Sequence, residues 1–194
     1  MSFKALNKAL ATFGEKTLFY ARGNLKLKGF DGKKRPTQNT GKLGDGLGFE
    51  IKEEDDSLVL NFTTKEKYGV FIEWGVNGTK NNRGSDFSFK KKFVNIGAIK
   101  KYIKSPKFKL RKVYKNKYGQ TVSKLVPKNQ KNIDSAAFLI SRSIAEKGIR
   151  KVPAVQKGAE RALNDEIPNM EEALAKDVKD IMIFNLKNAG IKTK

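Results

Sequence analysis

Apolar residues recur every three or four positions across residues 3–27, and this spacing predicts an amphipathic helix. The apolar stripe begins at Phe3 and reaches Leu25, while the lysines of the segment lie mostly off it. Gly14 and Gly23 lower the helix propensity and leave room for a break near either position. We expect this helix to face a protein core.

Residues 47–52 and 58–63 alternate between apolar and other side chains, which predicts two β-strands. The acidic link 53–57 between them suits a hairpin turn. Its acids lack the spacing of a calcium loop, so we expect a solvated turn. The preceding residues 29–46 are polar and rich in glycine, and they lack the GxxxxGK[ST] order of a phosphate-binding loop. We expect a surface loop there.

Residues 68–75 form the densest aromatic cluster and hold the only tryptophan. The segment is either a third strand or a short helix, and its apolar run predicts burial. Glu73 lies within this run, and a carboxylate there needs a hydrogen-bonding partner or an edge position.

The last third of the chain is predicted to be helical. A first helix extends from an N-cap at Asp134 to Lys147, and Gly148 is its C-terminal stop. A second helix begins at Pro153, a residue that suits the first turn.

A third helix is predicted from a capping box formed by Asn169 and Glu172, and Gly190 is expected to end it. Its apolar face is wider than a single stripe. We therefore expect it to pack on two sides or against another copy of the chain.

Together these elements predict an α+β fold, with a small antiparallel sheet packed by the N-terminal helix and the C-terminal helices. The length of 194 residues fits one domain, 1–194, with a basic insertion at 76–131.

Charge is concentrated in this insertion. Residues 80–131 hold 17 of the 41 Lys and Arg residues and a single acid, Asp86, whereas both flanks are nearly balanced. Such a segment is expected to meet a polyanion or an acidic protein surface. The pattern predicts a short helix from Ile96 to Ile103, ended by Pro106, and then a protruding hairpin around 115–120. The candidate contact residues are Lys90, Lys91, Lys92, Lys100, Lys101, Lys104, Lys107, Lys109, Arg111, Lys112, Lys115 and Lys117.

The chain has no cysteine and no histidine, which argues against disulfides, the usual transition-metal sites and histidine-based catalysis. We expect no cofactor and no enzymatic activity, although a lysine or carboxylate nuclease site stays an open alternative. We find no secretory signal and no apolar run long enough for a membrane span, so we expect a soluble protein made in a cytoplasm.

The order of the motifs NTGKLGDGLGFEI, KYGVFIEWGVNGTK and SAAFLISRSIAEKGIRKVPAVQKGAERAL is specific. It resembles that of the tail-completion or head–tail joining (neck) proteins of long-tailed bacteriophages and of the related virion-morphogenesis proteins. The likeness covers most of the chain except about 80–130, and the chain departs from the family pattern at Trp74 and Ala154. The residues at motif positions to which we assign a structural role are Tyr68, Phe71, Glu73, Trp74, Gly75, Arg142, Gly148 and Pro153.

The resemblance implies a structural virion protein that forms a ring, often of six or twelve copies, between the portal and the tail. Its partners would be copies of itself, neighbouring portal, neck or tail proteins, and genomic DNA in the channel if the basic segment lines it. It would be located in the virion after assembly in the cytoplasm of a host bacterium. The alternative is a DNA-binding accessory protein without sequence preference, which would explain the charge but not the order of the motifs.

Overall fold

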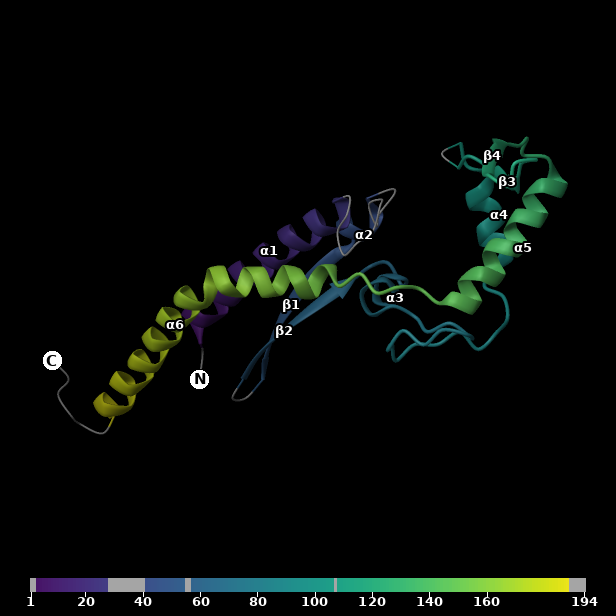
Figure 1. Ribbon diagram of the computed structural model, residues 1–194. Helices are drawn as coiled ribbons and strands as arrows, with labels where there is room; N and C mark the ends of the chain where they lie inside the picture. Colours follow the sequence, from purple (N-terminus) through teal and green to yellow (C-terminus); the bar gives the residue numbers. More distant parts are fainter. Residues whose placement is uncertain (1–2, 28–40, 55–56, 107, 189–194) are drawn as a thin grey trace. The chain divides into compact units, whose positions relative to one another are not determined.

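The computed structural model describes residues 3–27, 41–54, 57–106 and 108–188, and these hold six helices and two antiparallel sheets of two strands each (Figure 1). The fold is α+β, as the sequence predicted. The chain forms two compact units: unit 1 is Met1–Glu73 with Val152–Lys194, and unit 2 is Trp74–Lys151. The sequence predicted one domain with an insertion at 76–131. Unit 2 is longer than that insertion because it also includes a helix that packs within it.

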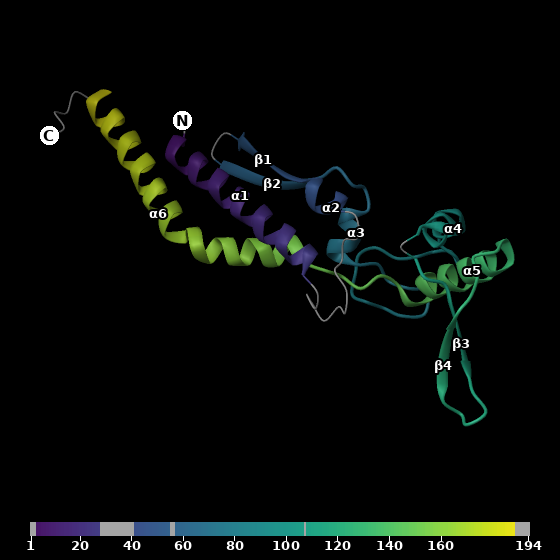
Figure 2. The same cartoon turned by 90° about the horizontal axis from the view of Figure 1, so that it is seen from above.

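Unit 1 is built on two helices, α1 (Lys4–Lys26) and α6 (Ala154–Asn188), which lie side by side in both views (Figures 1 and 2). Their close approach depends on a glycine. A Cβ atom on Gly158 would lie 2.8 Å from the carbonyl oxygen of Thr17 and 3.0 Å from the backbone nitrogen of Ala21. A larger residue would therefore push the two helices apart.

The helix α1 is unbroken through both of its glycines. Gly14 lies under the ring of Phe49, which would be 2.8 Å from an added Cβ, so this glycine makes room for the sheet. No side chain caps the N-terminus of α1 locally. Instead, the buried carboxylate of Asp177 in α6 accepts hydrogen bonds from the backbone N–H groups of Ala5 and Leu6, at 3.1 and 2.8 Å.

The prediction of two separate C-terminal helices was wrong, because α6 is continuous. Asn169 does not open a new helix: its side-chain amide donates to Glu166, a buried carboxylate that also pairs with Lys16. The helix bends in its middle (Figure 2), and Pro168 accounts for the bend because proline removes a helical hydrogen bond. The predicted stop at Gly190 lies outside the described residues.

The predicted hairpin is confirmed as β1 (Leu47–Glu54) and β2 (Ser57–Thr64), in an antiparallel register that sets Phe49 opposite Phe62. The tip of its acidic turn, 55–56, lies outside the described residues. So does most of the predicted surface loop, of which the final residues form the short helix α2 (Lys42–Asp45). The buried core of unit 1 comprises Leu18, Ala21, Leu25, Leu43, Leu47 and Ala154.

The aromatic cluster forms a short helix, α3 (Gly69–Trp74), one of the two predicted alternatives. The predicted burial was wrong, because only Gly69 of this helix is buried. A Cβ on Gly69 would lie 2.9 Å from the side chain of Thr64, so the helix docks on β2 through a residue without a side chain. As a result Trp74 and Tyr68 are 57% and 45% exposed.

Unit 2 contains the predicted short helix α4 (Ile96–Lys104) and a longer helix α5 (Gln130–Lys147). They pack through the buried side chains of Ile103, Ile133 and Ala137. The N-cap predicted at Asp134 was wrong. Asn129 caps α5 one turn earlier, by accepting a hydrogen bond from the backbone N–H of Asn132 at 2.9 Å.

The predicted basic hairpin is confirmed as β3 (Arg111–Lys115) and β4 (Thr121–Leu125). It projects from the α4–α5 pair (Figure 2), and every residue of β3 is exposed.

The two ends of unit 2 are joined to each other. Val76 and Ile149 form an antiparallel pair with N–H···O distances of 2.8 Å in both directions. Gly75 and Gly148 flank this pair with φ angles of +76° and +74°, a left-handed conformation that favours glycine. Gly148 is also the C-cap of α5, as predicted.

Candidate functional site

The two units carry very different charges. Unit 2 has 21 basic and 3 acidic side chains, a net charge of +18, whereas unit 1 has 20 basic and 17 acidic side chains, a net charge of +3. The cationic character of the chain therefore belongs to unit 2. This unit is the first candidate site, and the motif residues around Glu73 are the second.

Two of the three acids in unit 2 are occupied by internal ion pairs. Asp134 lies 2.7 Å from the ammonium group of Lys100, and Glu146 lies 3.0 Å from Lys80 and 2.9 Å from the guanidinium of Arg142. Hydrogen bonds from these cations lower the pKa of both carboxyl groups below their ordinary values. Most of the cations of the unit are left without an acidic partner among the described residues.

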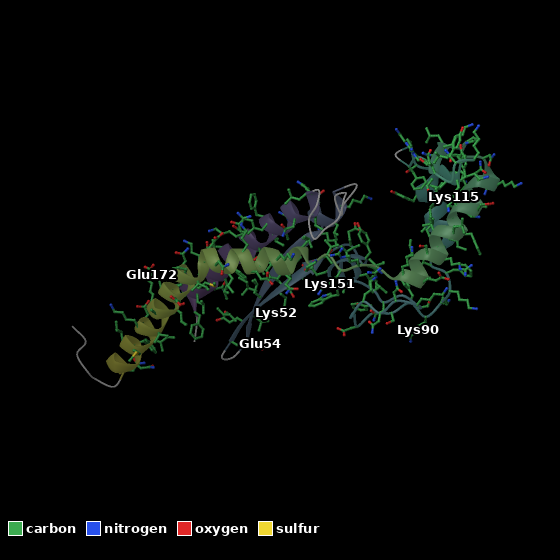
Figure 3. The ribbon with its side chains drawn as sticks, in the orientation of Figure 1. Lys52, Glu54, Lys90, Lys115, Lys151 and Glu172 are labelled. Atoms are coloured by element: carbon green, nitrogen blue, oxygen red, sulfur yellow. The ribbon has the colours of Figure 1, made fainter. Side chains whose placement is uncertain are left out.

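The structure separates the predicted contact residues into three groups. The first occupies the exposed loop before α4, the second lies on α4, and the third lies on and around the β3–β4 hairpin; Figure 3 labels Lys90 of the first and Lys115 of the third. Among the described members of these groups, only Lys100 forms an ion pair, with Asp134, and Lys107 lies outside the described residues. The groups are Lys90, Lys91 and Lys92; Lys100, Lys101 and Lys104; and Lys109, Arg111, Lys112, Lys115 and Lys117.

The hairpin register adds Lys124, which was not among the residues predicted from the sequence. Lys124 lies directly opposite Lys112, and Tyr114 lies opposite Val122, so these four residues share one face of the hairpin. The signal was present in the sequence, because a turn at 116–120 fixes this register. The other face carries Arg111, Val113, Lys115, Thr121, Ser123 and Leu125.

The second candidate site lies at the start of α6. The carboxylate of Glu73 accepts hydrogen bonds from the backbone N–H groups of Val155 and Gln156, at 3.1 and 2.9 Å. It therefore caps α6, and the backbone of α6 is the hydrogen-bonding partner that was predicted for this acid from its apolar neighbours. Burial raises the pKa of the Glu73 carboxyl, and the hydrogen bonds from the helix only partly oppose that shift.

The remaining motif residues differ in their burial. Pro153 is buried directly before α6, and Gly75 has no room for a side chain because an added Cβ would lie 2.8 Å from the backbone of Ile149. Arg142 is exposed on α5 and pairs with Glu146. The side chains of Tyr68, Phe71 and Trp74 are 39% to 57% exposed.

The helix α6 carries further apolar surface. Its bulky side chains with more than a third of their surface exposed are Leu163, Ile167, Leu174, Val178, Met182 and Phe184. A groove of about 820 Å³ opens beside Phe184, between the C-terminal half of α6 and the start of α1. Charged residues also line it, and among them Asp177 already caps α1.

Nothing in the described part of the chain has the composition of a metal centre, since no three Asp, Glu, His or Cys side chains gather there. Among the same residues, no helix has the length and apolar character needed to cross a membrane. The features of the described surface that can bind a partner are the positive charge of unit 2 and the exposed apolar side chains of α6.

Comparisons of the chain with protein-family models, with curated proteins and with solved structures gave no match.

Proposed function

We propose that this chain is a structural subunit that forms a ring in the neck or upper tail of a long-tailed bacteriophage and joins the head and portal to the tail. The observation that carries the proposal is the contact between two motif segments far apart in the sequence. Within unit 1, Glu73 of the first segment caps the helix that Pro153 of the second segment introduces, and within unit 2, Val76 pairs with Ile149. In each unit, the two motif segments therefore contact each other.

The exposed apolar side chains of α6 supply the kind of surface that a ring subunit needs. On a helix of 3.6 residues per turn, Leu163, Ile167, Leu174 and Val178 fall within about 60° of one another. Each is between 39% and 43% exposed. A stripe of this kind gains free energy when a second copy covers it.

The proposal is tested by adding an affinity tag to this chain in bacterial cells that produce tailed particles from the genome that encodes it. We expect the chain to sediment with purified particles at several copies per particle, and to appear as a ring between head and tail in images of those particles. Its absence from the particles contradicts the proposal. So does metal-dependent DNA cleavage that a single carboxylate substitution abolishes.

The role of the α6 stripe is tested by Leu174→Gln with Val178→Gln, which we expect to lower the copy number in particles at least several-fold. The matched control is Glu172→Gln with Lys179→Gln, two exposed positions on the other side of the same helix. The control removes one charge of each sign and should leave incorporation unchanged.

A further inference from the structure

The β3–β4 hairpin holds two lysines in opposed positions, and no residue of the hairpin neutralises them. Lys112 and Lys124 face each other directly across the two strands, and neither has an ion pair among the described residues. Like charges in opposed positions destabilise a β pair. No acid lies between residues 87 and 133, so nothing local in the sequence offsets the repulsion.

The hairpin also lacks apolar cover. All five residues of β3 and four of the five residues of β4 are exposed, including Val113 at 63% and Leu125 at 56%. A two-stranded hairpin without a packed face is marginal in water. An anion placed between Lys112 and Lys124 would turn their repulsion into attraction and so stabilise the hairpin in its bound form.

Tyrosines accompany the lysines. Tyr114 shares the face of Lys112 and Lys124 and is 46% exposed. Tyr118 at the turn is 73% exposed, and the ammonium group of Lys117 lies 4.9 Å from the centre of its ring. Cationic side chains beside exposed aromatic rings are the combination that binds the backbone and the bases of nucleic acids.

The composition of unit 2 favours a nucleic acid over an acidic protein surface. Of its 21 basic residues 17 are lysines and 4 are arginines. Protein interfaces are depleted in lysine and enriched in arginine, so this composition is the reverse of what a protein partner selects. Lysine binds phosphate as a point charge, without the fixed bidentate geometry by which arginine reads bases, and a DNA duplex offers about one charge per 1.7 Å of its axis.

We propose that the face of the hairpin formed by Lys112, Tyr114 and Lys124 binds the phosphodiester backbone of nucleic acid without sequence preference. The proposal does not depend on the proposed ring, because it concerns residues outside the motifs that resemble the phage family. Duplex and single strands share the phosphodiester chemistry, and separate probes distinguish them.

The test uses the full chain and two fluorescent probes, a 30-base-pair DNA duplex and a 30-nucleotide thymidine strand, titrated from 50 to 300 mM NaCl. Lys112→Gln with Lys124→Gln is expected to weaken binding to both probes at least 10-fold. The slope of log K against log salt should fall by about 2 on the duplex and by about 1.4 on the single strand, since each phosphate contact contributes about 0.9 and about 0.7, respectively. The matched control, Arg111→Gln with Lys115→Gln, removes the same charge from the opposite face. It is expected to change affinity less than 3-fold. Equal losses in the two double variants would overturn the proposal.

A second variant separates stacking from charge. Tyr114→Ala should weaken binding to the single strand about 5-fold or more and leave the duplex within 2-fold, whereas Tyr114→Phe should bind both probes normally. Polyglutamate is the competitor that represents an acidic protein. Displacement of DNA by polyglutamate at equal charge concentration, or absence of DNA binding at 50 mM NaCl, contradicts the nucleic acid assignment. Hydrogen exchange of the hairpin amides in each variant confirms that a loss of binding is not a loss of folding.

Discussion

The two units of this chain are stabilised in different ways. Unit 1 has nearly balanced charges and a core in which two long helices approach closely across Gly158. Unit 2 has a net charge of +18 and a central cluster of three buried side chains, Ile103, Ile133 and Ala137. The difference indicates that unit 1 depends mainly on packing between its elements, whereas the surface of unit 2 carries a large uncompensated positive charge.

If the units are stabilised independently, a packing defect in one should leave the other intact. Gly158→Ala places a methyl group against the backbone of α1 and should destabilise unit 1 by about 2–3 kcal/mol. Hydrogen exchange read by mass spectrometry should then show faster exchange in α1 and α6 and unchanged exchange in α4 and α5. The control is Gly23→Ala, at a helical glycine with no atom within 4 Å of an added Cβ, which should stabilise α1 by about 0.5–1 kcal/mol. Equal effects of the two alanines would contradict the close helix contact.

The reciprocal change is made in unit 2. Gly148→Ala forces a side chain into a left-handed conformation and against the backbone of Gly78, 2.6 Å from the added Cβ. We expect a loss of about 1–3 kcal/mol confined to unit 2. Gly84→Ala is a control for the conformational part, because Gly84 also has a positive φ but no atom within 4 Å. A defect that spreads equally to α1 would show that the units are not independent.

The stabilities of the two units should respond differently to salt in the unmutated protein. Raising NaCl from 50 to 500 mM screens repulsion between the cations of unit 2 and should stabilise that unit by on the order of 1 kcal/mol. Unit 1, with 20 basic and 17 acidic side chains, should change much less. Hydrogen exchange, measured for each unit at both salt concentrations, reports the two stabilities. An equal response of the two units would contradict the proposed difference between them.

The smallest effect concerns Glu73 and its dependence on pH. Since burial raises its pKa in the folded state, the stability that protonated Glu73 contributes is present below its unfolded value, and it is lost as the pH rises through the folded value. The non-titrating variant Glu73→Gln should therefore lack this decline. Relative to Glu73→Gln, the unmodified protein should lose stability as the pH rises from 4 to 8, by less than about 1 kcal/mol. Parallel pH profiles would contradict the assigned burial of this carboxyl.

Periodicity predicted most elements of the fold, and its failures have physical causes. It gave α1, both hairpins and α4, because their apolar spacing or turn chemistry is local. It failed at Asn169, where a capping pattern lies inside a helix that α1 stabilises along its length. The short helix α3 was one of two predicted alternatives, but its expected burial was wrong, because the helix docks through Gly69 and the half-buried Ile72 and leaves its aromatic side chains exposed.

The candidate sites were predictable to different degrees. The cationic segment was evident from composition, but its organisation into two hairpin faces required the strand register, which is why Lys124 was missed. The need of Glu73 for a partner was predictable from its apolar neighbours. The identity of that partner, the N-terminus of a helix beginning some 80 residues later, depends on tertiary structure that no local pattern encodes.

The pairing of Val76 with Ile149 has a consequence for the length of the segment that lies between them. Paired strand residues have Cα atoms only about 5 Å apart, so the two ends of unit 2 lie close together. The entropy of closing a loop rises slowly with its length, so the entropic cost of closing the segment between these ends depends little on its length. A shorter or longer segment between Val76 and Ile149 is therefore expected to be tolerated, provided that the pair itself is kept.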